Sequence, residues 1–322
     1  MQAFVDAIAA ITPSTDAERL IHGRGGMLPG GEHLCVDWFP PALLLTSFRE
    51  LTTDELHKLQ QALVQRFAEL NLPLNLVYQH RAGGQTQTVL LQGELPEPHV
   101  VTENGRQFYV HLLRGQNHGL FLDMRNGRQW VAENAKFKKV LNLFSYTCAF
   151  SVAALSGGAD EVVNIDMAKG ALSTGKQNHV LNEMPSGARF LGHDIFKSWG
   201  KLKKLGPYDL LIADPPSNQK GSFVATKDYV RLLRRLPELL NDGADVLLCL
   251  NAPELGRDFL MQQVADTLPQ LRFIEQIENP PVFADVDADR ALKVLLYRYH
   301  ADAVVAADAD TDVQAEAGSS AA

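Results

Sequence analysis

The pattern of apolar and polar residues along the chain changes near residue 110. Before this point, short apolar runs flank turn-forming pairs, which predicts three hairpins. Their strands are Cys35–Phe39 with Leu43–Ser47, Leu74–Gln79 with Thr88–Gln92, and Val100–Thr102 with Gln107–Leu112. Between them, an apolar residue recurs every three or four positions from Asp54, the expected cap, to Leu70, which predicts a helix. Residues 1–110 are therefore expected to form a small α/β domain.

Beyond residue 110, apolar strands alternate with helical segments up to about residue 300. The expected strands are Val140–Phe144, Glu161–Ile165, Ala188–Leu191, Tyr208–Ala213, Ala244–Leu250, Leu271–Ile277 and Leu292–Tyr297. The expected helices are Cys148–Ser156, Lys169–Asn182, Thr226–Leu240 and Glu254–Leu268. This alternation is typical of an α/β fold with a Rossmann-like, largely parallel sheet covered on both faces. Residues 111–300 are expected to form this second domain, with ligands binding beyond the carboxyl ends of its strands.

Composition and charge narrow the class of protein. Hydrophobic residues make up 46% of the chain and charged residues 21%, as in ordinary globular proteins. No apolar run approaches the ~20 residues that span a bilayer, and the first residues lack a basic region, so a cytoplasmic protein with no membrane partner is expected. Residues 301–322 contain five acidic residues and no Lys or Arg, which predicts a disordered acidic tail. The net charge of −8 includes this tail, so charge neither favours nor excludes RNA as a partner.

Neither cysteine nor histidine spacing suggests a metal site or a disulfide. The three cysteines, Cys35, Cys148 and Cys249, form no C-x-x-C pair. The ten histidines show no spacing typical of zinc ligands. We expect buried free thiols and no metal.

Acidic residues follow three successive strands of the second domain. Asp166 follows the strand that starts at Glu161, Asp194 follows the next strand, and Asp214 follows the strand that starts at Tyr208. Each one alone could cap a helix, but three at corresponding strand ends predict one ligand site. A carboxylate there can accept both hydroxyls of a ribose, and another can accept from an adenine amino group. The turn after the first strand, Phe144–Phe150, offers backbone amides to an anionic group but lacks G-x-G-x-x-G, which argues against a dinucleotide.

At these residues the sequence resembles the class I RNA methyltransferases related to the bacterial large-subunit rRNA cytosine-5 and guanine-N7 enzymes. The matching stretches are Gly119–Arg125, Val140–Thr147, Val163–Asp166, Asp214–Pro216 and, nearer the start, Arg19–Gly23 with Leu28–Gly30. The resemblance covers residues 18 to 300 and implies S-adenosylmethionine as cofactor. The residues it implies around the cofactor are Phe121, Asp123, Arg125, Phe144, Ser145, Tyr146, Thr147, Asp166, Met167, Asp194, Ile195 and Asp214.

Three departures from the family bear on function. A PUA-type RNA-binding domain, common in relatives, is not expected here, because residues 1–322 leave no room for it. Cys148 stands where relatives usually have glycine, and its side chain is expected to crowd the methionine end of the cofactor. The turn after the fifth strand, where cytosine-5 enzymes carry a nucleophilic thiol, reads Leu250-Asn251-Ala252-Pro253. Methyl transfer to a nitrogen is therefore expected, less so to oxygen or carbon.

The expected catalytic groups are the Asp214 carboxylate and the backbone carbonyl of Pro215, which can accept a hydrogen bond from an amino group of the target. Ser217 stands where adenine-N6 enzymes have an aromatic residue, which weakens that option. The expected substrate-binding residues are Ser217, Lys220, Lys227, Arg231 and Asn251, with Arg234 and Arg235 on the same basic helix face. The Asn279–Phe283 stretch looks like an amino-methylating motif but follows the sixth strand, so a turn is expected.

The leading hypothesis is a methyltransferase acting on structured RNA, with ribosomal RNA favoured. Two alternatives stay open: a catalytically silent RNA-binding or ribosome-assembly factor, and a small-molecule methyltransferase. The oligomeric state, the methylated atom and the RNA position stay undetermined at this point.

Overall fold

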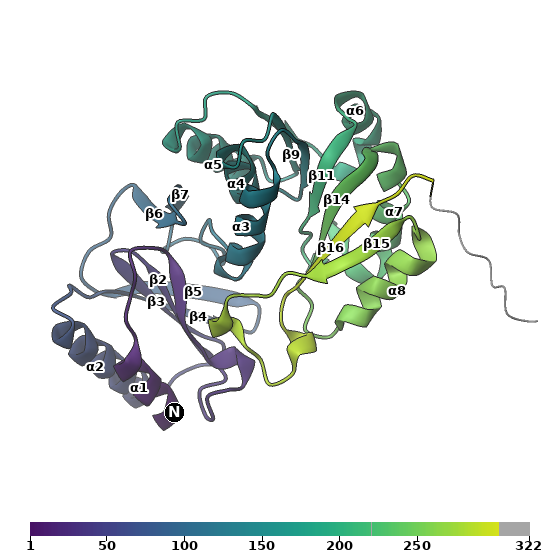
Figure 1. The fold of residues 1–322 in the computed structure, drawn as a ribbon. Helices are drawn as coiled ribbons and strands as arrows, with labels where there is room; N and C mark the ends of the chain where they lie inside the picture. The colour runs from purple at the N-terminus through teal and green to yellow at the C-terminus, as the bar shows by residue number, and fades with distance from the viewer. Residues whose placement is uncertain (220, 303–322) are drawn as a thin grey trace, which may run out of the picture.

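A computed structural model describes residues 1–219 and 221–302, and contains two main sheets (Figure 1). The first sheet has five strands in the order β1-β2-β3-β4-β5. Their bounds are Glu18–His22, Leu34–Phe39, Ala42–Ser47, Asn75–Ala82 and Gln85–Gln92. Only β3 and β4 pair in parallel, and the other neighbours are antiparallel. The predicted hairpins in this region are confirmed.

Two helices cover one face of this first sheet, on the side away from the second sheet (Figure 1). Helix α1, Gln2–Ala10, was not expected from the sequence, and helix α2 spans Thr53–Glu69. The expected cap Asp54 is wrong, because Thr52 accepts from the Glu55 amide while the Glu55 side chain accepts from the Thr52 amide. This capping box satisfies two amide groups that a helix start leaves unpaired.

A short hairpin and a helix connect the two sheets. The hairpin consists of β6, His99–Glu103, and β7, Arg106–Val110, around the predicted Asn104-Gly105 turn. The chain then passes through a 3-10 helix, η2 (Leu122–Met124), into α3 (Arg125–Asn134), which the sequence pattern did not predict. Apolar residues of the first sheet, the hairpin and the second sheet's helices share one cluster, which joins the two parts.

The second sheet has seven strands in the order β10-β9-β8-β11-β14-β16-β15. In chain order, the strands are β8 Lys139–Leu143, β9 Glu161–Asp166, β10 Ala188–Gly192, β11 Tyr208–Ala213, β14 Leu240–Leu250, β15 Leu271–Gln276 and β16 Lys293–Tyr299. Strand β16 is antiparallel to both neighbours, and the other pairs are parallel. The chain leaves β8 toward β9 and β10 and returns to β11, so the switch point lies between β8 and β11. The predicted α/β, Rossmann-like class is confirmed.

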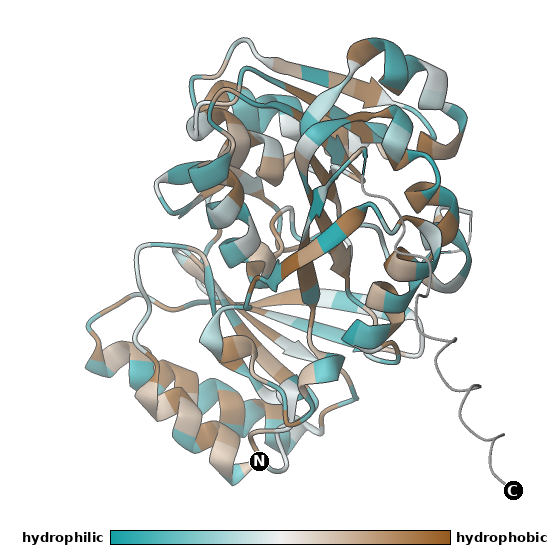
Figure 2. Ribbon diagram, turned by 45° about the vertical axis from the view of Figure 1, so that its right-hand side comes forward, coloured by the Kyte–Doolittle hydropathy of each residue, from teal (hydrophilic) through white to brown (hydrophobic). Residues whose placement is uncertain are grey.

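Helices cover both faces of this sheet, whose strands are largely brown in the hydropathy view of Figure 2. The helices are α4 Ala149–Ser156, α5 Lys169–Leu181, α6 Trp199–Leu205, α7 Ala225–Leu233 and α8 Arg257–Thr267. Apolar residues of α6, α7 and α8 pack on one face, and those of α3 and α4 pack on the other. A sheet buried on both faces explains why its strands are nearly continuous apolar runs.

The main correction in this region concerns the helix expected over Thr226–Leu240. Helix α7 ends at Leu233, a 3-10 turn (η4, Leu236–Glu238) follows, and β14 begins at Leu240 rather than Ala244. Pro237 cannot donate a backbone hydrogen bond, which favours this early end. The acidic tail expected over 301–322 lies, from residue 303 on, outside the described residues. Within the described chain, no helix is long and apolar enough to cross a membrane.

Candidate functional site

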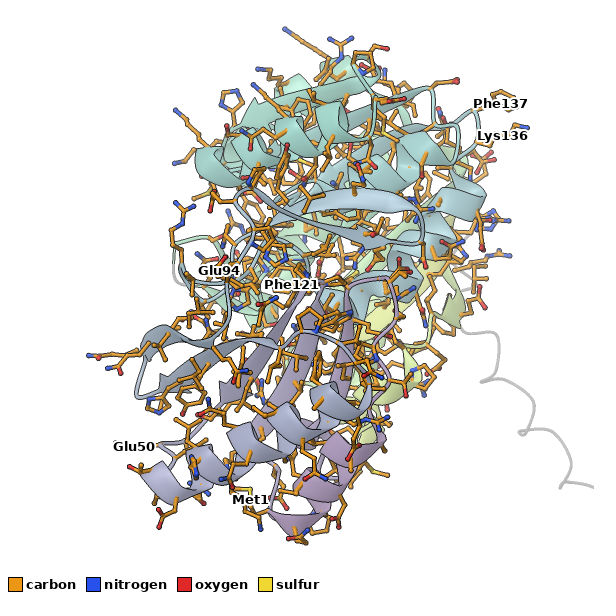
Figure 3. The ribbon with its side chains drawn as sticks, turned by 90° about the vertical axis from the view of Figure 1, so that its left-hand side faces the viewer. Met1, Glu50, Glu94, Phe121, Lys136 and Phe137 are labelled. Atoms are coloured by element: carbon orange, nitrogen blue, oxygen red, sulfur yellow. The ribbon has the colours of Figure 1, made fainter. Side chains whose placement is uncertain are left out.

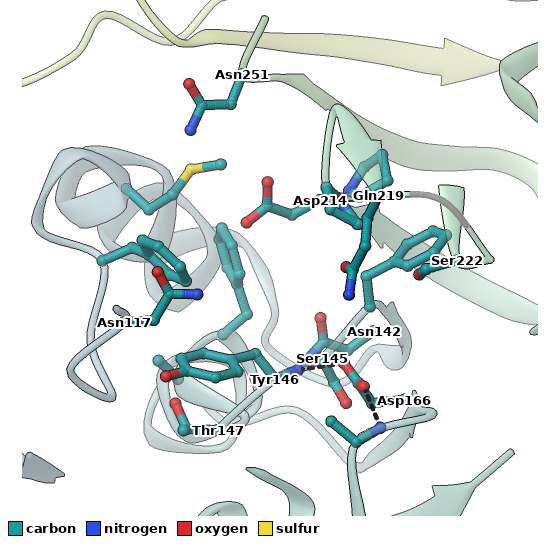
Figure 4. Close-up of a pocket in the computed structure, with 18 of the residues that line it drawn as sticks. Asn117, Asn142, Ser145, Tyr146, Thr147, Asp166, Asp214, Gln219, Ser222 and Asn251 are labelled. Atoms are coloured by element: carbon teal, nitrogen blue, oxygen red, sulfur yellow. Dashed lines mark hydrogen bonds between the residues drawn. The ribbon is translucent and has the colours of Figure 1, made fainter. Parts of the chain in front are cut away.

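A cavity of about 650 Å³ opens at the carboxyl ends of β8, β9, β10 and β11, across the switch point (Figure 4). The three strand-end acids, Asp166, Asp194 and Asp214, all line it. Parallel strands end at the same edge of a sheet, so residues that directly follow them converge. The predicted convergence of the three carboxylates is therefore present in the structure.

The turn between β8 and α4 forms one wall of the cavity. Its backbone has positive φ at Phe144 (55°), Tyr146 (46°) and Cys148 (61°), and at neither of the two residues between them. Such alternation turns successive backbone amides toward one side, a geometry that binds anions. The Ser145 hydroxyl on this wall is buried and has no hydrogen-bond partner within the described chain. An unpartnered buried hydroxyl beside amide groups fits a ligand carboxylate.

Asp166 ties this turn to the loop after β9. One of its carboxylate oxygens accepts from the Tyr146 amide at 2.8 Å, and the other accepts from the Ala168 amide at 2.7 Å (Figure 4). A carboxylate has about four acceptor positions, so both oxygens can still accept a ligand hydroxyl. The arrangement fits a vicinal diol such as that of ribose.

Asp194 has a capping role as well as a place in the cavity wall. Its side chain accepts from the Phe196 amide at 2.9 Å and so caps a short 3-10 helix, η3 (Ile195–Lys197). Ile195 and Phe196 line the cavity beside it. An acceptor next to apolar side chains fits the edge and face of an adenine-like ring.

Asp214 lies at the end of β11, where burial controls its ionisation. Burial, together with the negative charge of Asp123, raises the pKa of Asp214 to about 7, while the charge of Arg128 acts in the opposite direction. Burial also raises the pKa of Asp123. A carboxyl group that titrates near neutral pH can hold or release a proton under working conditions.

Aromatic side chains form the side of the cavity nearest the first sheet. The rings of Phe121 and Tyr146 lie 5.4 Å apart between centroids, and Phe121 is 40% exposed at the junction of the two parts (Figure 3). The Phe121 carbonyl accepts from the Arg128 guanidinium at 2.7 Å, and Arg128 pairs with the buried Glu103 at 2.6 Å. This buried ion pair therefore holds the aromatic edge of the site in place.

Several predicted positions lie in the cavity wall as expected. They are Phe121, Asp123, Phe144, Ser145, Tyr146, Thr147, Asp166, Met167, Asp194, Ile195, Asp214, Pro215, Ser217 and Asn251. The loops after β11 and β14 are joined by a hydrogen bond from the Ser217 hydroxyl to the Asn251 carbonyl.

Three predicted site residues are placed elsewhere, and a fourth cannot be assessed. Arg125 donates to Asp16 at 2.7 Å and to Asn104 at 2.8 Å, so it joins the two parts of the chain and does not line the cavity. Arg231 pairs with Asp228 at 2.5 Å and stacks over Phe196. Lys227 is exposed outside the cavity. Lys220 lies outside the described residues.

The basic helix face expected to bind RNA is partly neutralised, because two of its residues have acidic partners while Lys227 and Arg234 have none within 4 Å in the described chain. Arg231 has Asp228 as its partner and Arg235 has Glu238 at 3.0 Å. Lys227 and Arg231 lie outside the cavity wall, contrary to expectation, and their binding to RNA stays a prediction.

The sequence reasoning missed cavity residues on two loops and one strand. Asn117 belongs to the exposed loop before η2, Gln219 and Ser222 belong to the small β12–β13 hairpin (Asn218–Gln219 with Phe223–Val224), and Asn142 lies within β8. Figure 4 shows Asn117 and Gln219 on different sides of the cavity, with Asp214 between them. Of these residues, only Asn142 could have been predicted from the sequence, because it is a polar residue inside an otherwise apolar strand.

None of the three cysteines, all within the described chain, lines the cavity. Cys249 is fully buried in the apolar core on β14, and burial raises its thiol pKa well above the ordinary range. Cys148 packs toward α5, so the expected crowding of a cofactor by its side chain is wrong. The Asn279–Phe283 stretch forms a turn with the 3-10 helix η5 (Pro281–Phe283), as predicted, and does not line the cavity.

Comparison with known proteins assigns the chain and its fold to one family. A family model described as S-adenosylmethionine-dependent methyltransferase matches residues 18–298. Ribosomal RNA large subunit methyltransferase I of Aeromonas salmonicida (strain A449) is 36% identical over 190 residues, 57% of this chain and 48% of that protein. The protein of the same name from Aliivibrio fischeri (strain MJ11) is 31% identical over 276 residues, 81% of this chain and 68% of that protein. The matched region thus spans about half of the first relative.

Similar solved structures are also described as methyltransferases. A structure described as a candidate methyltransferase complexed with SAH has a TM-score of 0.77 and 26% identity, over 88% of this chain and 75% of that chain. A candidate SAM-dependent methyltransferase from Streptococcus mutans has a TM-score of 0.79 and 25% identity, over 92% of this chain and 81% of that chain. The turn after β8 and the acids Asp166 and Asp194 have the chemistry to accommodate the carboxylate, diol and adenine of such a ligand.

Proposed function

This chain belongs to the S-adenosylmethionine-dependent methyltransferase family, and we propose that it methylates a base nitrogen of structured RNA, with ribosomal RNA as the substrate. The relatives named above carry ribosomal RNA in their names, which supports this substrate class. Ribosomal RNA is made and matured in the bacterial cytoplasm, so we propose the same location for the protein.

The cofactor contacts follow from the cavity walls. We assign the amides of the turn after β8 and the Ser145 hydroxyl to the cofactor carboxylate, Asp166 to the ribose hydroxyls, and Asp194 to the adenine amino group. When bound, the cofactor supplies a methyl group whose bond to sulfur breaks as the bond to the substrate nitrogen forms. Apolar residues such as Ile195 and Phe196 exclude water from this region.

Asp214 and Pro215 would hold the substrate nitrogen that receives the methyl group. An amino group held by the Asp214 carboxylate and the Pro215 carbonyl keeps its lone pair directed into the cavity, which favours in-line transfer. Because its pKa is about 7, the Asp214 carboxylate can also accept the proton that the methylated nitrogen releases. Phe121 and Tyr146 offer aromatic surface beside the base.

One observation carries the choice of nitrogen over carbon 5 of cytosine. Attack on the cytosine ring needs a thiolate, and no cysteine of this chain lines the described cavity. Asn251 occupies the wall where the cytosine-5 relatives carry that thiol. Crowding of the cavity by Cys148 no longer supports the silent-factor alternative, because this side chain packs toward α5; the missing thiol is compatible with both readings.

Mass spectrometry of nucleosides from ribosomal and transfer RNA of a deletion strain tests the proposal. We expect one N-methylated nucleoside of ribosomal RNA to disappear, and the purified protein with labelled cofactor to restore it. Loss of 5-methylcytidine instead would contradict the choice of nitrogen. If the methylated nucleosides of both ribosomal and transfer RNA are unchanged in the deletion strain, the proposed substrate class is contradicted.

A further inference from the structure

Two arginines and a phenylalanine gather at one end of the first sheet. In the sheet register, His22 lies opposite Cys35, Leu34 opposite Ser47, and Ser47 opposite His80, so the ends of β1, β3 and β4 meet. Arg24, Phe48 and Arg81 come one or two residues after His22, Ser47 and His80. The topology of the sheet therefore brings together residues that are far apart in the chain.

Both guanidinium groups stack on the same ring. The Arg24 guanidinium carbon lies 4.2 Å from the centroid of Phe48, and that of Arg81 lies 5.2 Å from it. Stacking holds the guanidinium plane in place and leaves its N–H edge available for a planar or tetrahedral anion.

Neither arginine has an acidic partner within 4 Å in the described chain, and the buried Nε of Arg81 has no hydrogen-bond partner there. Arg49, at the same end of the sheet, differs: it pairs with Glu55 through two contacts of 3.0 and 2.6 Å. Burial lowers the pKa of Arg81, and the positive charge of Arg24 lowers it further. Two like charges that share one ring without a counter-ion favour the arrival of an anion.

Two chain segments connect the arginine pair to the wall of the active-site cavity. Arg81 and Gln79 lie on the same face of β4, and the Gln79 amide donates to the Gly115 carbonyl at 3.2 Å. Gln116 and Asn117, the next residues of that loop, line the cavity. On the other side, the Val286 amide donates to the Gly25 carbonyl at 2.8 Å, which holds the Arg24 loop against the segment between β15 and β16. That segment leads to Leu292, another cavity residue.

We propose that Arg24 and Arg81, held by Phe48, bind a backbone phosphate of the RNA whose target base enters the cavity. This inference rests on the proposed RNA substrate. It places the RNA backbone next to the target base against the first sheet. Phosphate contacts position an RNA without reading its sequence, and arginine binds phosphate through two parallel N–H groups. The site serves in this chain in addition to any contact made by the basic helix face, where Arg231 and Arg235 are paired with acidic residues.

Filter binding of a large-subunit ribosomal RNA transcript at several salt concentrations tests this site. For the Arg24→Ala/Arg81→Ala variant, we expect Kd to rise roughly tenfold and the slope of log Kd against log salt to fall by about one, because the two arginines together hold one phosphate. Arg49→Ala is the matched control, since it removes a paired arginine from the same sheet end. Arg24→Lys/Arg81→Lys keeps the charges and should retain most of the salt slope. Circular dichroism melting verifies that each variant is folded.

The outcomes separate this inference from the proposed function. If the double alanine variant binds with wild-type Kd and slope, or weakens only as much as Arg49→Ala, the phosphate site is wrong even when methylation of RNA stands. A second outcome is that the wild-type protein binds RNA without methylating it, while the double alanine variant binds RNA more weakly than wild type. In that case the proposed function fails and the phosphate site stands. Calorimetry with cofactor should give the same affinity for wild type and the double variant, and a loss there would overturn a role limited to RNA.

Discussion

The sulfur of Cys148 packs against Gly175: a β-carbon added at Gly175 would lie 2.5 Å from that sulfur and 3.2 Å from the Thr147 carbonyl oxygen. The turn residue with positive φ therefore directs its side chain into helix α5, which makes room for it with a glycine. This contact explains how a cysteine occupies the cofactor turn without entering the cavity. The first prediction follows from it.

Gly175→Ala should lower the free energy of unfolding by about 1–3 kcal/mol, because the added methyl group forces the Cys148 side chain to move. Cys148→Gly in the same chain should recover most of this loss, since glycine tolerates the positive φ and the methyl group then fills the space of the thiol. Urea unfolding of the two single variants and the double variant measures the coupling. Additive losses would show that the two residues do not share the space.

Asp166→Ala should weaken cofactor binding roughly 10- to 100-fold, corresponding to a loss of about 1.5–3 kcal/mol for hydrogen bonds to a charged acceptor. The substitution removes the proposed acceptor for the ribose hydroxyls and also frees the Tyr146 and Ala168 amides. Isothermal calorimetry with the cofactor measures the effect. Asp160→Ala is the control, because this exposed acid stands at the opposite end of β9. Equal affinity in both variants would remove Asp166 from the cofactor site.

The methyl-transfer rate should rise with pH through about 7, as Asp214 loses its proton and becomes a hydrogen-bond acceptor. Asp214→Asn should lower the rate and remove this pH dependence. Initial rates with saturating RNA and cofactor across the neutral range test both statements. A profile with the same midpoint in the Asn variant would assign the titration to another group.

The raised pKa of Asp214 also affects stability. Whereas the methyl-transfer rate should rise with pH, the free energy of unfolding should fall. The folded pKa of about 7 lies above the ordinary aspartate value of about 4, so between these values the folded state keeps a proton that the unfolded chain has lost. The free energy of unfolding should therefore fall as pH rises through this window and level off above it. Asp214→Asn should flatten this slope in urea unfolding. A slope unchanged by the substitution would contradict the raised pKa.

Arg128→Met should destabilise the protein by about 3–5 kcal/mol, because it leaves the buried Glu103 carboxylate without its partner. Arg128→Met with Glu103→Gln should recover part of this loss, since no charge then stays buried. The exposed pair of Arg189 with Glu161 offers the control, and Arg189→Ala should cost less than about 1 kcal/mol. Thermal and urea unfolding compare the variants. A loss for Arg128→Met no larger than that for Arg189→Ala would contradict the structural role of the buried pair.

Cys249→Ala should retain the methyl-transfer rate on RNA while losing some stability, since the thiol is buried in the core and lies outside the cavity. Activity assays below the melting temperature of the variant separate the two effects. Complete loss of activity in a folded Cys249→Ala protein would point to thiol chemistry and to carbon as the methylated atom.

The sequence by itself determined that the second domain has a largely parallel sheet and that acidic residues follow three of its strands. Apolar runs of strand length, separated by helical segments, predict a parallel sheet from local periodicity alone, and residues that directly follow parallel strands must share one edge. The meeting of Asp166, Asp194 and Asp214 in one cavity follows from this geometry. Turn signals such as Asn104-Gly105 are equally local, which is why the hairpins were predictable.

The tertiary structure alone decided where individual side chains point. Arg125 is the last residue of a matching motif but binds Asp16, 109 residues earlier in the chain, and so does not line the cavity. Cys148 lies outside the cavity because Gly175, in another helix, leaves room for its sulfur. Asn117 and Gln219 reach the cavity from loops that no strand end specifies. A side chain's direction depends on the space and the hydrogen-bond partners supplied by residues distant in sequence, and local periodicity carries no information about these contacts.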